Sequence, residues 1–184
     1  MRIAGGKVKG VRILPPAIRG ARPTTELMRE VIFNVLGQNK ICGARILDLF
    51  AGTGSLGIEG LSRGAETADF VEANGKQCAV IQTNLKLCGF DQNGKVYRMK
   101  AEQSLKVLTG SYGVVVMDPP YRLEEVGSIV EKLSTSNLVG DDGIVAVGHS
   151  KRQMLTETYG ALTRIKSSRH GDSMVDFYIK DGSR

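Results

Sequence analysis

The chain has 184 residues, of which 41% are hydrophobic, so wholesale disorder is excluded and one domain with a substantial core is expected. No apolar run approaches the length that spans a membrane, and no signal-peptide segment follows the N-terminus, so we expect no membrane partner and a cytoplasmic location. The first 30 residues hold seven Lys or Arg and two Glu, a surplus of +5 within a net charge of +6. This distribution is typical of a protein that binds a phosphate backbone, although a solvated basic surface is the alternative.

The cysteines and histidines indicate neither a disulfide framework nor a metal centre. Cys42, Cys78 and Cys88 are odd in number and form no C-x-x-C motif, so we expect reduced thiols. His149 and His170 have no nearby cluster of further ligands, so we expect no metal.

Residues 1–22 are predicted to form a basic N-terminal arm, and residues 23–184 the main domain. Two short β-like runs, 1–4 and 11–14, are separated by glycines, which favours a small β-hairpin or an extended arm. The arm has no aromatic residue, so it can bind phosphates but offers no surface on which bases stack. Candidate nucleic-acid contacts in and just after the arm are Arg2, Lys7, Lys9, Arg12, Arg22, Thr24 and Arg29.

A helix is predicted to follow the arm. Thr24 or Thr25 is suited to its N-cap and Gly37 to its C-cap, and apolar residues recur between them with helical spacing. Arg29 lies away from the middle of the apolar stripe. It could contact a substrate phosphate or the cofactor, or it could be a plain surface residue.

From residue 45 onward, predicted strands alternate with predicted helices. The strands are expected at 45–50, 67–71, 95–99, 112–117 and 143–147. The helices are expected at 54–63, 75–87, 102–108, 123–133 and 151–159. Residues 161–165 and 174–179 are expected to close the chain as an antiparallel pair. This alternation predicts an α/β protein with a doubly wound, mostly parallel sheet.

Asp118-Pro-Pro-Tyr121 ends the most apolar of the predicted strands, where ligands bind in open α/β sheets. The Asp118 carboxylate and the Pro119 carbonyl can accept both N–H bonds of an amino group on a heteroaromatic ring. That arrangement favours a pyramidal nitrogen and stabilises its developing positive charge, while Pro120 stiffens the turn and Tyr121 offers a stacking face. The alternative is a simple exit turn with a helix-capping Asp.

Asp48-Leu-Phe-Ala-Gly-Thr-Gly-Ser-Leu-Gly57 joins the first strand to its helix. Gly52 and Gly54 allow the backbone to pass close to a ligand, and with Gly57 they match a dinucleotide-binding fingerprint. Asp48 would disfavour a nearby pyrophosphate but could accept hydrogen bonds from an ammonium group. Glu72 ends the second strand at the spacing of a ribose-binding carboxylate, with a helix-capping role as its alternative. A nucleoside joined to a cationic amino acid describes S-adenosylmethionine.

On these residues the chain resembles the bacterial 16S rRNA (guanine-N2)-methyltransferases, a branch of the class I S-adenosylmethionine-dependent methyltransferases. The matching motifs cover essentially the whole chain. They are Met-Arg-Ile-Ala-Gly-Gly at the start, Arg22-Pro-Thr-Thr, Arg29-Glu-Val-Ile-Phe-Asn34, Asp48–Gly57, Leu61-Ser-Arg-Gly-Ala65, Glu72, Asp118–Tyr121 and Gly171-Asp172.

The resemblance implies a Rossmann-like seven-stranded class I methyltransferase sheet whose last strand is antiparallel. It implies transfer of a methyl group from S-adenosylmethionine to the exocyclic N2 of a guanine in 16S rRNA, within the small ribosomal subunit or a late assembly form of it; we expect a monomer. The residues implied to hold the guanine are Asp118, Pro119 and Tyr121, and those implied to hold the cofactor are Asp48, Phe50, Ala51, Gly52, Gly54 and Glu72. Where relatives often have Asp or Asn before Ala, this chain has Lys100-Ala101-Glu102, so Glu102 or a backbone carbonyl would contact the adenine.

Other functions compete with this prediction. Adenine-N6 methylation of nucleic acid is one, although in DNA it usually needs a separate recognition domain, for which 184 residues leave little room. Protein glutamine methylation is another, although its motif resembles Asn-Pro-Pro-Tyr, whereas position 118 of this chain is Asp. A non-catalytic RNA-binding assembly factor and a nicotinamide-dependent oxidoreductase are the remaining alternatives, and binding of S-adenosylmethionine or NAD would distinguish them.

Overall fold

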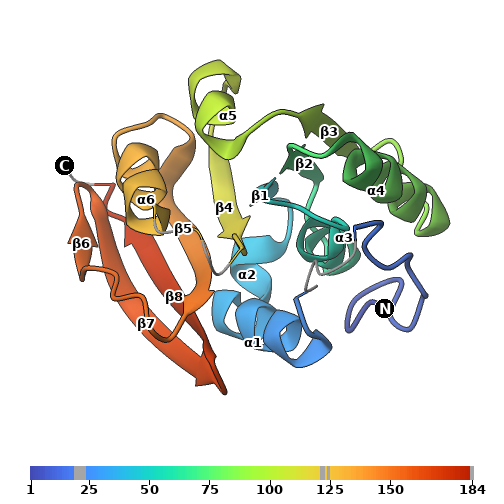
Figure 1. Ribbon diagram of the computed structural model, residues 1–184, viewed down its shortest axis with the longest axis horizontal. Helices are drawn as coiled ribbons and strands as arrows, with labels where there is room; N and C mark the ends of the chain where they lie inside the picture. The colour runs from blue at the N-terminus through green and yellow to red at the C-terminus, as the bar shows by residue number, and fades with distance from the viewer. Residues whose placement is uncertain (19–23, 121–122, 124, 183–184) are drawn as a thin grey trace.

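The computed structural model describes residues 1–18, 24–120, 123 and 125–182, and within them one sheet of eight strands runs across the molecule (Figure 1). The strand order is β3-β2-β1-β4-β5-β8-β7-β6. The strands are β1 (Arg45–Leu49), β2 (Thr67–Glu72), β3 (Gly94–Arg98), β4 (Tyr112–Met117), β5 (Val139–Ser150), β6 (Thr158–Tyr159), β7 (Leu162–His170) and β8 (Ser173–Lys180).

Strands β1 to β5 pair in parallel, whereas β8 pairs antiparallel with both β5 and β7. The predicted α/β class, the mostly parallel sheet and the antiparallel last strand are therefore confirmed. The predicted number of seven strands is wrong for the described residues, because β6, a two-residue strand, pairs with β7 at the edge.

Helices cover both faces of the sheet. They are α1 (Glu26–Leu36), α2 (Gln38–Ile41), α3 (Ser55–Ser62), α4 (Gly75–Leu87), α5 (Ala101–Val107) and α6 (Val126–Ser134). Successive side chains of a strand point to opposite faces, so Val114 and Val116 of β4 join the core under α1, α3 and α4, while Val115 and Met117 join the core under α5 and α6. Burial on both faces accounts for the near-continuous apolar sequence of this strand.

The predicted helix at 151–159 is wrong. The structure has a turn after Ser150 and then β6, and the Thr156 backbone N–H donates to the Tyr159 hydroxyl. Most of this segment is exposed, including Met154 at 96%. A short helix is stable mainly when it packs an apolar face, and of the two apolar residues at 151–157 only Leu155 packs against the core.

The N-terminal segment, residues 1–18, packs against α3 and α4. An antiparallel bridge joins Arg2 to Arg12, and the neighbouring Ile3 and Ile13 are buried in the main core. The backbone N–H of Leu14 donates to Asn84 of α4 at 2.7 Å. The division into an arm of residues 1–22 and a domain of residues 23–184 stays a prediction, since its boundary falls among residues 19–23, outside the described part.

Helix α1 begins and ends as the sequence predicts. Thr25 is its N-cap and accepts from the backbone N–H of Met28 at 3.2 Å, and Gly37 is its C-cap with a φ of 75°. Within the described residues, no helix has the length and apolar character needed to cross a bilayer. The same residues contain no group of three or more His, Cys, Asp or Glu arranged to hold a metal ion.

Candidate active site

A cavity of about 1020 Å³ opens at the carboxyl ends of β1, β2 and β4. Because β1 pairs directly with β4, with Leu49 opposite Met117, the loops that follow these strands are neighbours. Phe50 and Gly52 from the first loop and Asp118 and Pro119 from the second line the same cavity. The structure therefore brings together the two motifs on which the sequence-based prediction depends.

The first loop has a backbone that only a few residues can adopt. Gly52 and Gly54 have φ values of 56° and 76°, which glycine tolerates without strain. Phe50 has a φ of 59°, which is uncommon for a residue with a side chain, and lies half-buried in the cavity wall. Such conformations are found where a loop is shaped for a ligand.

Asp48 lies inside the protein. Asp48, Ala51 and Gly54 are buried and are not among the described residues that line the cavity. One Asp48 oxygen accepts from the Gly57 backbone N–H at 2.8 Å, and the other has no hydrogen-bond partner among the described residues. The pKa of Asp48 is raised to about 8, mainly by burial and also by the charges of Asp118 and Glu72, while the hydrogen bond from Gly57 opposes the shift.

Glu72 holds two loops together at the cavity wall. One carboxylate oxygen accepts from the Gly52 backbone N–H at 3.0 Å, and the other accepts from the Asn74 N–H at 2.8 Å. A carboxylate has about four acceptor positions, so Glu72 retains capacity for ribose hydroxyls. The alternative role of Glu72 at a helix N-terminus also has support, because the Asn74 N–H that it accepts from belongs to the N-cap residue of α4.

The hydrogen-bond acceptors and the volume of the cavity fit S-adenosylmethionine. Glu72 can accept from the ribose, and the buried unpaired oxygen of Asp48 gives the loop an acceptor next to a cationic amino acid end. Ala101 and Glu102 also line the cavity, as the adenine prediction requires, together with Met99 and Lys100. The cavity volume is at the upper end of the usual range for ligand sites, roughly 300–1,000 Å³, so a second group can enter beside the cofactor.

The Asp118 carboxylate lies against two segments that are distant from it in the sequence. One oxygen accepts from the Thr24 hydroxyl at 2.5 Å. The other lies so close to Gly148 of β5 that a Cβ there would be 2.6 Å from it. Pro119 and Pro120 follow in the cavity wall, whereas Tyr121, the predicted stacking residue, lies outside the described residues.

Arg29, predicted as a possible RNA contact, is fully buried, so the predicted phosphate contact is wrong for this conformation. Its guanidinium donates to the backbone carbonyls of Thr24, at 2.7 Å, and Arg2, at 2.5 Å, and lies 3.7 Å from the Glu59 carboxylate. Burial lowers the pKa of Arg29, and the charge of Glu59 opposes that shift. Arg29 therefore connects the N-terminal segment to the residue that contacts Asp118.

The other predicted RNA contacts lie in the N-terminal segment or just after it. The side chains of Arg2, Lys7, Lys9 and Arg12 are exposed, and Arg22 lies outside the described residues. Thr24 lines the cavity, but its hydroxyl is engaged by Asp118. The Lys7 backbone N–H donates to the Ser62 carbonyl at the end of α3 farther from the cavity.

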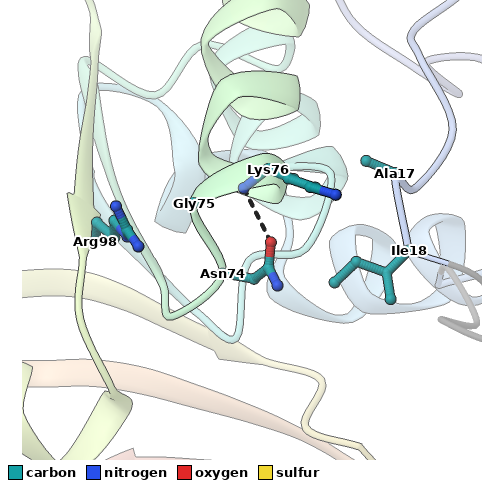
Figure 2. Close-up of a pocket in the computed structure, with 6 residues that line it drawn as sticks. All are labelled: Ala17, Ile18, Asn74, Gly75, Lys76 and Arg98. Carbon is teal, nitrogen blue, oxygen red and sulfur yellow. Dashed lines mark hydrogen bonds between the residues drawn. The ribbon is translucent and has the colours of Figure 1, made fainter.

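A second depression, of about 620 Å³, adjoins the main cavity (Figure 2). Ile18 lines both, and the depression is completed by Ala17, by Asn74, Gly75 and Lys76 at the start of α4, and by Arg98 at the end of β3. No motif in the sequence indicates Lys76 or Arg98 as site residues. Their proximity depends on the pairing of β2 with β3, which no local motif reveals.

No local motif in the sequence indicates the roles of Gly148 and Thr24 beside Asp118. Both act on Asp118, from 30 residues after it and 94 residues before it in the chain. A glycine at the end of a strand was the available signal for Gly148, since it permits a close approach.

Comparisons with known proteins agree with this geometry. The family model described as conserved hypothetical protein 95 matches residues 1–179. A Bacillus subtilis protein, YlbH, named provisionally as an rRNA methyltransferase, is 36% identical and covers 99% of this chain and 100% of its own. The ribosomal RNA small subunit methyltransferase D of Escherichia coli K12 is 32% identical over 80% of this chain and 73% of its own.

Solved structures show the same fold. The Escherichia coli protein yhhF, described provisionally as a methyltransferase, has a TM-score of 0.83 at 28% identity and covers 98% of both chains. The Haemophilus influenzae protein HI0767, described provisionally as a methylase, has a TM-score of 0.82 at 27% identity with the same coverage.

Proposed function

The chain belongs to the family described as conserved hypothetical protein 95, and from this membership we propose that it methylates the exocyclic N2 of a guanine in 16S rRNA, using S-adenosylmethionine. The resemblance predicted from the sequence is thereby confirmed, and so is the class of enzyme, an rRNA methyltransferase. One observation carries the proposal: the glycine loop after β1 and the Asp118 turn after β4 line one cavity.

In this proposal the first half of the cavity holds the cofactor. Glu72 accepts from the ribose, while Ala101 and Glu102 flank the adenine. Asp48 and the Gly52–Gly54 backbone receive the amino acid end; a cationic group arriving there favours ionisation of Asp48, whose pKa burial has raised. When bound, S-adenosylmethionine supplies an electrophilic methyl group on a sulfonium.

The second half holds the base. Asp118 and the Pro119 carbonyl accept the two N–H bonds of the guanine amino group, which directs the nitrogen lone pair toward the cofactor side of the cavity. Pro120 fixes the turn, and Tyr121 stacks on the ring. No strong base is needed, since the nitrogen becomes acidic once it is methylated. The rate gain comes mainly from positioning the two reactants.

The substrate is RNA whose target guanine has left its stack, which costs a few kcal/mol. Contacts between exposed cations of the chain and RNA phosphates offset that cost. The small ribosomal subunit or its late assembly form supplies the RNA, the enzyme works as a monomer without a metal ion, and its place is the cytoplasm, where ribosomes assemble.

Replacement of Asp118 tests the chemistry. We expect Asp118→Ala to abolish methyl transfer to 16S rRNA, because the acceptor for the amino group is lost, and to leave S-adenosylmethionine binding largely intact. The measurements are transfer of labelled methyl groups and a titration with the cofactor. Asp91→Ala removes an exposed carboxylate outside the cavity lining and should be fully active. Undiminished transfer by Asp118→Ala would remove this residue from the mechanism.

Mapping the methylated nucleotide separates the competing functions. Ribosomal RNA from cells with and without the protein should differ at the N2 of one guanine. A difference at an adenine N6 would instead support the adenine-methylating alternative. A chain that binds RNA but not S-adenosylmethionine would be an assembly factor that has kept the fold.

A further inference from the structure

The turn between β7 and β8 gathers cations around one carboxylate. Asp172 is 76% exposed, and its carboxylate lies 2.5 Å from the Lys151 ammonium. The Lys151 backbone N–H also donates to the Asp172 carbonyl at 3.0 Å, which joins the end of β5 to the turn. Gly171, with a φ of 62°, supplies the left-handed conformation the turn requires.

Two arginines complete the cluster. Arg152 follows Lys151 directly, and the Arg169 side chain donates to the Gly171 carbonyl at 3.3 Å. The pKa of Asp172 is lowered mainly by the hydrogen bond and charge of Lys151, and the charges of Arg152 and Arg169 lower it further. Three cations thus surround one carboxylate, and the two arginine side chains remain exposed.

The cluster lies at the rim of the cavity. In the β7–β8 register, Arg169 is opposite Met174 and His170 is opposite Ser173. Both Met174 and Ser173 line the cavity. Figure 1 shows the β7–β8 hairpin extending beyond the arrowhead of β4, the strand that Asp118 directly follows.

The predicted basic arm places two of its cations farther from the cavity. Lys7 and Lys9 lie by the C-terminal end of α3, whereas the loop that lines the cavity leads into the N-terminal end of that helix. Eight helical residues span about 12 Å. A phosphate close to a base held at Asp118 is therefore better placed for the hairpin cations than for Lys7 or Lys9.

We propose that Lys151, Arg152 and Arg169 form a second phosphate-binding surface, which holds the RNA backbone beside the target nucleotide. The inference rests on the proposed function, because it assumes that RNA is the substrate. Exposed guanidinium groups bind phosphate oxygens through two parallel N–H bonds, and Asp172 holds the lysine beside them. RNA then contacts the protein on both sides of the cavity, at the N-terminal segment and at the hairpin.

The test compares two double variants that each remove two positive charges. Arg152→Gln/Arg169→Gln changes the hairpin, and Lys86→Gln/Lys106→Gln changes exposed lysines of α4 and α5 outside the cavity lining. Affinity for 16S rRNA is measured over a range of salt concentrations, together with methyl transfer, cofactor affinity and thermal unfolding. For two lost phosphate contacts, the slope of log affinity against log salt should become shallower by about 1.4 to 1.8.

We expect the hairpin variant to show this shallower slope and a raised KM for RNA, with unchanged cofactor affinity and melting temperature. A slope equal to that of the lysine control would overturn the proposal. The unsubstituted chain reports separately on the proposed function. If it transfers no methyl group to 16S rRNA, that function fails, while the difference in slope still decides whether the hairpin binds RNA.

Discussion

Thr24 and Gly148 fix the Asp118 carboxylate from two sides. The Thr24 hydroxyl donates to one oxygen at 2.5 Å, and the absence of a side chain at Gly148 leaves room for the other. Thr24 is itself held by Arg29, which donates to its carbonyl. Thr24 is therefore better described as a positioning residue for Asp118 than as an RNA contact.

A pair of substitutions at Thr24 tests this role. Thr24→Val keeps the shape but removes the hydroxyl, and a hydrogen bond to a charged group is worth roughly 1.5–3 kcal/mol, so kcat should fall about 10- to 100-fold. Thr24→Ser keeps the hydroxyl and should retain most of the activity. Steady-state kinetics with rRNA provides the measurement, and KM should change little. If the serine variant loses as much activity as the valine variant, the hydroxyl is not the relevant group.

At the scale of single residues, the sequence predicted what depends on local motifs. Asp118 and Glu72 stand at strand ends, and both line the cavity. The prediction of an exposed Arg29 is wrong because its burial depends on the Arg2 carbonyl and on Glu59. Both belong to other segments of the chain, which the helical pattern around Arg29 does not indicate. A buried arginine is rare, so exposure was the natural expectation.

Helix α3 packs on β2 through Gly57. A Cβ at this position would lie 2.3 Å from the Phe70 ring, which is completely buried. The third glycine of the loop motif thus allows the helix to approach the strand closely, and the same helix carries the Gly57 N–H that Asp48 accepts.

Gly57→Ala should destabilise the protein. Overpacking a tight core costs about 1–3 kcal/mol, which exceeds the roughly 0.5–1 kcal/mol that alanine contributes in a helix. Urea unfolding should show a lower midpoint. Gly113→Ala is the matched control, because an added Cβ there meets nothing nearer than 3.5 Å. A Gly57→Ala protein as stable as the parent would mean that α3 and β2 separate without cost.

At the scale of elements, hydrophobic patterning predicted the strands of the parallel half and the helices between them. The pattern is strongest in β1, β2 and β4, because these strands are buried on both faces. The segment 151–159 carries no comparable pattern, and its conformation is set by contacts such as that between Thr156 and the Tyr159 hydroxyl. The two-residue β6 is too short to leave a recognisable signal.

Across the whole molecule, most of the net charge of +6 comes from the first 30 residues, which include the N-terminal segment. Neutralising Lys7, Lys9 and Arg12 by substitution with glutamine should weaken RNA binding, and its salt slope should become shallower by up to about 2 to 3. The triple variant Lys86→Gln/Lys106→Gln/Lys132→Gln removes the same charge from α4, α5 and α6 and is the control. An unchanged slope in the first variant would mean that the N-terminal segment is not a phosphate contact.

The buried guanidinium of Arg29 joins the carbonyl of the second residue of the chain to the loop that meets the catalytic turn. Removal of the leading residues would take away the Arg2 carbonyl and leave one of the two donating guanidinium nitrogens without its acceptor in the interior. Truncation would therefore damage chemistry and RNA affinity together, and cannot separate them. Single substitutions of exposed cations separate RNA affinity from chemistry better than truncation does. A purification tag is better placed at the C-terminus.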